Sequence, residues 1–165
     1  MRVLIGLGAN QGNVAETFLR AVERLRERAD VVSCSGLWRS APLGPPQADY
    51  TNATALVEAG EHPAALLAFC QRLEAEAGRD RIREGRWGAR SLDLDLLIAA
   101  GVVVLSTALE LPHPRLAQRR FALAPAAELV PSWVHPRLWR TIGALAAAPE
   151  LAGQRCDRIG PFPAR

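Results

Sequence analysis

The sequence predicts an α+β fold, a β-sheet covered by helices, with the element order βαββαβ. Residues 2–8 are rich in Val, Leu and Ile, as expected for a buried first strand. Apolar residues then recur at helical spacing to about residue 29, and again after Pro63, which suits the first turn of a helix. Strand-like stretches occupy residues 31–39 and 50–60 between these helices, and a further strand runs through residues 92–98.

Capping and loop residues set the boundaries of these elements. A glycine-rich turn at residues 6–13 ends the first strand, and Asn13 with Glu16 resembles a capping box for the next helix. The turn reads G-x-G-x-x-x-G, one residue too long for a dinucleotide-binding fingerprint, so it indicates a tight strand-to-helix connection. Residues 41–46 must form a loop because their prolines fix φ and cannot donate hydrogen bonds. Gly78 is expected to end the second helix.

The C-terminal third adds smaller elements to this pattern. Gly101 predicts a turn into a short strand at 102–105. Short helices are expected at 115–130 and 137–148, separated by two prolines. The complete prediction is a ferredoxin-like βαββαβ core with an extra short strand and C-terminal helices. At 165 residues without an internal repeat or linker, residues 1–165 are expected to form a single domain.

Composition excludes several classes of protein. All 20 basic residues are arginine, and the net charge is +3. Without lysine the chain cannot be a P-loop enzyme, a protein kinase or a Schiff-base enzyme. Any nucleotide must be held by arginine, histidine, backbone amides and metal. The three cysteines are far apart, so neither a disulfide framework nor a zinc site is indicated, and Cys34 and Cys70 are expected to be buried thiols.

The chain also lacks the signals of a membrane or exported protein. No apolar run is long enough to span a bilayer. The N-terminus enters a strand-like segment directly, without a separate signal peptide. A cytoplasmic location and no membrane partner are therefore expected.

The strand at residues 92–98 carries the strongest chemical signal. Residues two apart in a strand share a face, so Asp93 and Asp95 point together while Leu92, Leu94 and Leu96 point toward a core. Two carboxylates roughly 7 Å apart repel each other unless a cation is near. Their oxygens suit Mg²⁺, which commonly binds through one or two carboxylates and substrate phosphates. An ordinary solvent-facing strand is the alternative, but aspartate is disfavoured in strands.

An arginine-rich stretch precedes this strand and favours a polyphosphate ligand. It contains Arg72, Arg79, Arg81, Arg83, Arg86 and Arg90. Neighbouring acidic residues offset part of the charge, so a solvated surface loop is an alternative. RNA binding is a second alternative, but sheet-based RNA readers stack bases on strand aromatics, and the first and fourth strands have none. No nucleic-acid partner is therefore expected.

Two further polar positions are candidates for recognition. His113 lies between prolines and is followed by three arginines and Phe121, although a lone histidine is more often structural. His62 and His135 lack such neighbours and are interpreted as capping or surface residues. Asn52 opens the third strand, where an amide is disfavoured, so it is either a recognition group or a simple strand-start residue.

Taken together and in this order, several segments resemble 6-hydroxymethyl-7,8-dihydropterin pyrophosphokinase, a folate-pathway enzyme family. The Arg-Trp-Gly-x-Arg-x-Leu-Asp-Leu-Asp run is the most specific of them, and the resemblance covers nearly the whole chain. The segments are Gly8-Ala9-Asn10, Ala41-Pro42-Leu43-Gly44-Pro45, Asp49-Tyr50-Thr51-Asn52-Ala53, Gly78-Arg79, residues 86–95 and Pro112-His113-Pro114-Arg115.

The resemblance implies transfer of pyrophosphate from ATP to the pterin hydroxymethyl group, with release of AMP and the use of two Mg²⁺ ions. The protein is expected to be a monomer. The metal positions it implies are Asp93 and Asp95, which with Arg79 and Arg90 form the catalytic set. The positions it implies for ATP are Gln71, Glu74, Arg81, Arg86, Trp87, Leu96, His113 and Arg119. Those for the pterin are Ser40, Leu43, Tyr50, Asn52, Trp87 and Phe121, with Tyr50 and Phe121 stacking on the ring.

The loop 79–90 departs from the family pattern in two ways. It is one residue longer between Arg81 and Trp87, which leaves Arg83 unaligned, and Ala89 replaces a common proline. The loop is expected to close over ATP as it does in the family. Asp95 is a candidate for taking the hydroxyl proton, an assignment that the sequence leaves open. The alternative enzyme is another Mg²⁺-dependent nucleotidyl or phosphoryl transferase on the same scaffold.

Overall fold

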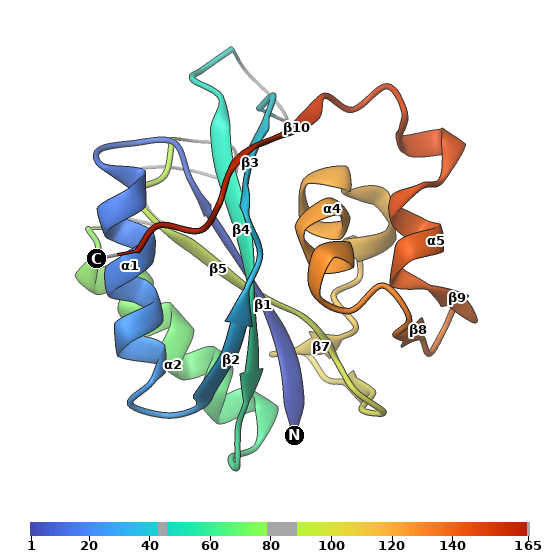
Figure 1. Ribbon diagram of the computed structural model, residues 1–165. Helices are drawn as coiled ribbons and strands as arrows, with labels where there is room; N and C mark the ends of the chain where they lie inside the picture. Colours follow the sequence, from blue (N-terminus) through green and yellow to red (C-terminus); the bar gives the residue numbers. More distant parts are fainter. Residues whose placement is uncertain (43–45, 79–88, 165) are drawn as a thin grey trace.

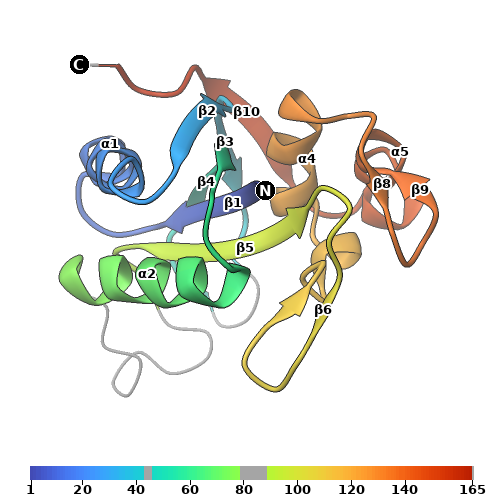
Figure 2. The ribbon, with the colours of Figure 1, turned by 90° about the horizontal axis from the view of Figure 1, so that it is seen from below.

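The computed structural model describes residues 1–42, 46–78 and 89–164, which form layered α and β structure (Figure 1). Its elements in chain order are β1 (Arg2–Ala9), α1 (Val14–Leu25), β2 (Asp30–Cys34), β3 (Leu37–Ser40), β4 (Tyr50–Glu58), α2 (Pro63–Glu76), β5 (Asp93–Ala99), β6 (Val104–Leu105), β7 (Glu110–Leu111), η1 (Leu116–Gln118), α4 (Arg120–Leu129), β8 (Val134–His135), β9 (Arg140–Thr141), α5 (Ile142–Ala146), η2 (Pro149–Leu151) and β10 (Cys156–Gly160). Helices α1 and α2 cover one face of the main sheet, and α4 and α5 lie on its other side (Figure 2).

The main sheet has the strand order β10-β3-β4-β1-β5, and β2 also pairs with β4. Each of these pairs is antiparallel. Strands β1 and β4 are therefore central, with β5 on one side and β2 and β3 on the other, as the ferredoxin-like pattern requires. The predicted α+β class is confirmed. Strand β10, which the sequence did not predict, extends the edge beyond β3.

The prediction of one continuous strand over residues 31–39 is wrong, because Ser35 and Gly36 divide it into β2 and β3. The Ser35 hydroxyl accepts a hydrogen bond from the Thr54 N–H at 2.9 Å and donates one to the Gly36 carbonyl at 2.8 Å. A Cβ on Gly36 would lie 2.6 Å from the Gly160 carbonyl oxygen. The close approach of β10 therefore requires glycine at this break.

The helix ends follow the capping residues closely. The Asn13 side chain caps α1 by accepting from the Glu16 N–H, but the helix ends at Leu25 rather than near residue 29. His62 is confirmed as the N-cap of α2, since its Nδ1 accepts from a backbone N–H of the first turn. Gly78 follows that helix with φ of 88°, a left-handed conformation that favours glycine.

The C-terminal helices are shorter than predicted. The first, expected over 115–130, is divided into η1 and α4 at Arg119, whose backbone is extended. The second, expected over 137–148, is helical only at residues 142–146. Before it, β8 and β9 form a hairpin whose turn contains Pro136 and Trp139, the latter with φ of 53°. That turn is incompatible with an earlier start of the helix.

Apolar residues pack on both faces of the sheet. On the α1 and α2 side, Val3, Ile5 and Leu7 of β1 are buried, and Leu4 of the same strand is buried on the α4 side. Cys70 and Cys156 are also buried, whereas Cys34 is only half-buried. None of the helices in the described ranges is long and apolar enough to cross a membrane.

Candidate functional site

The face of the sheet on the α4 side collects polar residues from several strands. The strand registers place Asn52 of β4 opposite Gly8 of β1, and Gly8 opposite Asp93 of β5. Trp38 of β3 lies opposite Asn52 on its other side. Because paired residues project from the same face, these positions form one row across the sheet. The next row consists of Thr54, Gly6 and Asp95.

Asp93 and Asp95 lie on this face as predicted. Leu92, Leu94 and Leu96, which alternate with them, are at most 3% exposed. An arginine from a different segment approaches each carboxylate. Arg90 Nη1 donates to Asp93 Oδ2 at 2.6 Å, and Arg119 Nη1 lies 3.6 Å from Asp95 Oδ2. The structure therefore assembles two carboxylates and two guanidinium groups on one face of the sheet.

The electrostatics of this cluster disfavour a charged Asp95. Burial raises the pKa of its carboxyl, and the neighbouring Asp93 raises it further, against the opposing effects of His113 and Arg119. Burial lowers the pKa of His113, although the Asp95 carboxylate acts in the other direction. A cation beside the two carboxylates would relieve both the repulsion and the loss of hydration.

The donor set fits Mg²⁺. Two half-buried carboxylates supply the hard oxygen ligands that this ion prefers. Within residues 1–42, 46–78 and 89–164 there is no group of three or more His, Cys, Asp or Glu side chains that could hold a metal. Two carboxylates alone leave coordination positions for water and for phosphate oxygens, which is how Mg²⁺ is usually bound with nucleotides.

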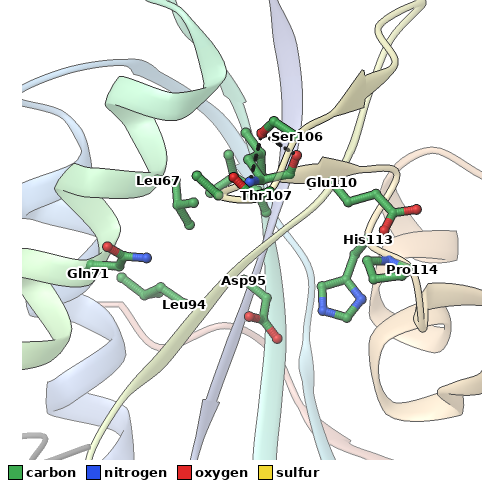
Figure 3. Close-up of a pocket in the computed structure, with 12 residues that line it drawn as sticks. Leu67, Gln71, Leu94, Asp95, Ser106, Thr107, Glu110, His113 and Pro114 are labelled. Atoms are coloured by element: carbon green, nitrogen blue, oxygen red, sulfur yellow. Dashed lines mark hydrogen bonds between the residues drawn. The ribbon is translucent and has the colours of Figure 1, made fainter.

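A cavity of about 320 Å³ adjoins Asp95 (Figure 3). It lies between α2, β5 and the segment that leads from β6 to His113. Its wall combines leucine side chains of α2 and β5 with polar side chains that include Asp95 and His113, so it suits a ligand with a flat apolar part and a charged tail. The lining residues are Leu67, Gln71, Leu94, Asp95, Leu96, Ser106, Thr107, Ala108, Leu109, Glu110, His113 and Pro114.

At the other end of the row, β3 and β4 bring two buried polar side chains together. Asn52 Nδ2 donates to Ser40 Oγ at 2.9 Å and to the Trp38 carbonyl at 3.4 Å. The Asn52 Oδ1 atom lies on the side of Gly8, toward the middle of the face. The amide is therefore held in a fixed orientation, with an acceptor directed at the space above β1.

Two aromatic rings lie on the elements that border this end. Tyr50 opens β4 and is half-buried. Phe121 is in the first turn of α4, which packs against β4 and β3, and the Arg119 guanidinium lies 5.5 Å from the centroid of its ring. Rings of this kind suit a planar ligand.

A comparison with protein families decides what this arrangement serves. The family model for 7,8-dihydro-6-hydroxymethylpterin-pyrophosphokinase (HPPK) matches residues 4–131, the range that contains each of these polar positions. The chain belongs to the HPPK family. It is accordingly an ATP-dependent pyrophosphokinase, a transferase of folate biosynthesis.

Individual HPPK relatives cover most of the chain. A 2-amino-4-hydroxy-6-hydroxymethyldihydropteridine pyrophosphokinase of Synechocystis is 38% identical over 141 residues, which are 84% of this chain and 71% of that protein. The protein of the same name from Haemophilus influenzae is 36% identical over 135 residues, 80% of this chain and 83% of that protein.

Solved structures of HPPK-DHPS proteins share the fold. The Plasmodium falciparum HPPK-DHPS A437G structure has a TM-score of 0.65 at 13% identity, over 88% of this chain. The chain spans only 44% of that longer protein. At this identity the likeness shows the fold alone, and it agrees with the ferredoxin-like arrangement of the sheet.

Most of the described site residues expected from the sequence lie on the α4 side of the sheet or at the cavity beside Asp95. Arg90, Asp93, Asp95, His113 and Arg119 come together. Gln71 and Leu96 line the cavity, and Ser40 and Asn52 are hydrogen-bonded to each other. Their roles stay predictions, as do the single domain, the monomeric state and the cytoplasmic location. Five expected site residues lie outside the described residues: Leu43, Arg79, Arg81, Arg86 and Trp87.

Glu74 has a contact that sequence reasoning did not predict. Its side chain is 1% exposed, and its Oε1 accepts a hydrogen bond from the Leu94 N–H at 2.8 Å. Leu94 is the residue between the two aspartates, so this bond fastens α2 to the middle of the Asp-Leu-Asp segment. The expected role of Glu74 in binding ATP stays a prediction.

Sequence reasoning also missed the role of Asn10. Its Nδ2 donates to Gln47 Oε1 and to the Ala48 carbonyl, each at 3.1 Å. Its Oδ1 accepts from the Arg90 N–H at 2.7 Å, and its own N–H donates to the Arg90 carbonyl. Asn10 thus joins the segment before Tyr50 to the arginine beside Asp93. The signals in the sequence were its place in the glycine-rich turn and in the Gly8-Ala9-Asn10 segment of the family resemblance.

Proposed function

We propose that this chain transfers the terminal diphosphate of ATP to the hydroxymethyl group of 6-hydroxymethyl-7,8-dihydropterin and releases AMP. The single observation that carries the proposal is the Asp93 and Asp95 pair, flanked by Arg90 and Arg119, beside a cavity. Relatives that are 36% and 38% identical and are named for this pyrophosphokinase support the choice of substrates.

The proposed reaction moves one diphosphate group. The hydroxyl oxygen of the pterin arm forms a bond to the β-phosphorus of ATP. The bond from that phosphorus to the oxygen that bridges the α- and β-phosphates breaks, and AMP leaves with this oxygen. Such a transfer needs positioning and neutralisation of charge more than covalent assistance, so a site without lysine is adequate.

We propose that Asp93 and Asp95 hold two Mg²⁺ ions. When bound, these ions would neutralise charge on the transferring phosphates and lower the pKa of the substrate hydroxyl. Arg90 and Arg119, one beside each carboxylate, would bind phosphate oxygens that lie between them. Asp95 is also the candidate acceptor for the hydroxyl proton, because it is the carboxylate that borders the cavity.

The cavity beside Asp95 is the proposed site of the nucleoside part of ATP. Its volume of about 320 Å³ is within the range of small-molecule pockets. Leu96 and Leu67 would contact the base, and Gln71 would offer an amide for hydrogen bonding. His113, on the same wall as Asp95, would meet the triphosphate. The ATP-binding residues of this proposal also include Glu74, Arg79, Arg81, Arg86 and Trp87.

The pterin is proposed to lie at the other end of the row. Asn52, oriented by Ser40, would accept hydrogen bonds from the ring edge through its Oδ1. Tyr50 and Phe121 would stack on the two faces of the ring. This assignment leaves the space above Gly8, between Asn52 and Asp93, for the arm that carries the reactive hydroxyl.

Product analysis tests the proposal. The purified chain is incubated with ATP, Mg²⁺ and 6-hydroxymethyl-7,8-dihydropterin, and the adenine nucleotides are separated and quantified. AMP should appear in equal amount to the pterin diphosphate, and a chelator of divalent cations should stop its formation. ADP as the nucleotide product would favour the alternative phosphoryl transferase and overturn the proposal.

A further inference from the structure

Strand β1 has an unusual composition on the face that carries the site. It lies between β4 and β5, and on the α1 and α2 side it presents Ile5 and Leu7, both buried. On the site side the corresponding positions are Gly6 and Gly8. Glycine inside a strand is unfavourable because it loses more backbone entropy than other residues and contributes no side chain to packing. Each glycine therefore requires a physical reason.

Packing accounts for Gly6 but not for Gly8. A Cβ on Gly6 would lie 3.3 Å from both terminal carbons of Leu97, so the neighbouring side chain restricts this position. A Cβ on Gly8 would meet nothing closer than Asn52 Oδ1 at 3.6 Å and Asp93 Cβ at 3.8 Å, which are ordinary contact distances. Gly8 is also not among the glycines with positive φ. The described fold would thus accept an alanine at this position.

The two atoms that a side chain at Gly8 would touch belong to the two halves of the proposed site. Asn52 Oδ1 is on the pterin side, and Asp93 is on the metal side. The row across the sheet puts one bare backbone position between them. A flat ligand that is bound by the amide and presents a hydroxyl to the phosphates must cross this position.

We propose that Gly8 is a specificity-determining position for the diphosphate acceptor. This inference rests on the proposed function. The heterocycle and its hydroxymethyl arm pack directly on the backbone of Gly8. Because Gly8 has no Cβ, the arm can approach the sheet closely between Asn52 and Asp93. A methyl group there lifts the acceptor away from the sheet. A displacement on the order of 1 Å at a reacting centre can cost about a hundredfold in rate.

The proposal predicts that the two substrates respond differently to a side chain at Gly8. The cavity assigned to the nucleoside is lined by residues of α2, β5 and the segment 106–114, and Gly8 is not among them. ATP binding should therefore be unaffected. A general disturbance of the strand would instead weaken both substrates and lower the melting temperature.

The test compares Gly8→Ala with the wild-type chain and with Gly60→Ala. The control glycine lies between β4 and α2, and a Cβ added there would have no atom within 4 Å. Steady-state kinetics are measured with each substrate varied in turn, and pterin and ATP binding are measured separately by calorimetry. For Gly8→Ala we expect kcat/KM for the pterin to fall by about tenfold to a hundredfold, with the KM for ATP within about twofold of wild type. The melting temperature should be unchanged or higher, since alanine replaces glycine inside a strand.

Each outcome has a distinct meaning. Wild-type kinetics in Gly8→Ala would overturn the specificity role and leave the proposed function intact. A parallel loss of affinity for both substrates, together with a lower melting temperature, would show that Gly8 serves the fold alone. If the wild-type chain formed no AMP, the proposed function would fail and this inference would fail with it. Gly60→Ala should match wild type in each measurement.

Discussion

The two faces of the central sheet are made by the same strands but have opposite character. Toward α1 and α2, Ile5 and Leu7 project into an apolar core in which each is at most 2% exposed. Toward α4, the alternate positions of the same strands include Gly8 and Asp95. One residue along a strand thus separates a position that stabilises the fold from one that serves the site.

The site face carries a carboxyl group whose charged form is disfavoured. Burial and the neighbouring Asp93 raise the pKa of Asp95 above its unfolded value. A group of this kind stabilises the fold only while it is protonated, and this contribution is lost as the pH rises through the folded pKa. The charged form of this carboxyl group is therefore unfavourable for folding. The β1 residues on the core face, Ile5 and Leu7, are apolar, so substitutions on the two faces of this strand should have separable effects.

The largest expected effect is the loss of turnover in Asp95→Asn. On the proposed chemistry, kcat should fall by about 10³-fold or more because a carboxylate that would hold the Mg²⁺ ions is lost. The melting temperature at about pH 7.5 and without Mg²⁺ should be equal to or above that of wild type, since a buried, repelled charge is removed. AMP formation and thermal unfolding measure the two quantities.

Asp157→Asn is the matched control, because Asp157 is an exposed carboxylate on β10. It should leave both turnover and melting temperature near wild type. A wild-type rate in Asp95→Asn would show that this carboxylate does not act in the reaction. A large fall in its melting temperature would remove the contrast between the two faces.

The next effect is on the opposite face of β1. Leu7→Ala should lower the free energy of unfolding by about 2–5 kcal/mol because it leaves a cavity in the core. The KM values and the kcat of the folded fraction should stay within about twofold of wild type. Chemical denaturation and steady-state kinetics below the melting temperature measure these effects.

Leu105→Ala, at a side chain that is 70% exposed, serves as the control for leucine truncation. It should change stability by less than about 0.5 kcal/mol. A large change in the KM for the pterin in Leu7→Ala would mean that the two faces of β1 are coupled, contrary to the comparison.

The sequence was sufficient for the order of the main elements and for the face of the aspartate pair, because both follow from local periodicity. It failed at Ser35 and Gly36, where the break between β2 and β3 depends on Thr54 and on a C-terminal strand distant in sequence. Tertiary contacts decided the pairing there, and no local pattern records them.

The same limit applied to the site. Asp93 and Asp95 were recognisable because a strand holds them two residues apart. The partners Arg119 and Asn10 come from other segments, and their distances to Asp95 and Arg90 exist only in the folded chain. The segment 106–110, which lines the cavity, has no chemical signature at all. Resemblance to a family supplied most of the other positions, whereas periodicity alone did not.

A smaller effect is expected at the hydrogen bond between Glu74 of α2 and Leu94 of β5. Glu74 is buried on the core side, yet its carboxylate accepts the Leu94 N–H between the two aspartates. Glu74→Ala should cost about 1–3 kcal/mol of unfolding free energy by leaving that buried N–H without this acceptor. The Glu74→Ala substitution should also lower kcat, because the backbone between the two aspartates loses a hydrogen bond that holds it in position.

The conservative variant Glu74→Gln separates positioning from charge. It keeps a carbonyl oxygen that can accept from Leu94, so it should recover part of both the stability and the kcat lost in Glu74→Ala. Equal losses in the two variants would show that the negative charge, rather than this hydrogen bond, is what matters. Denaturation curves and initial rates give the comparison.

The smallest expected effect is a pH dependence of stability from His113. Its pKa is lowered, chiefly by burial, so the unfolded chain binds a proton at a higher pH than the folded chain does. The stability that neutral His113 provides is therefore present above about pH 6.5 and is lost as the pH falls below it. The melting temperature of wild type relative to His113→Gln should decrease from about pH 8 to about pH 5.5.

His135 offers a matched comparison away from the site. It was expected to be a capping or surface residue, but it is buried in the β8 and β9 hairpin, where its Nδ1 accepts from the Arg137 N–H. Burial lowers its pKa too, so His135→Gln should change the pH dependence of melting in the same direction. Only His113→Gln should also lower turnover. If both variants changed stability and turnover equally, His113 would be a structural histidine with no specific role in the reaction.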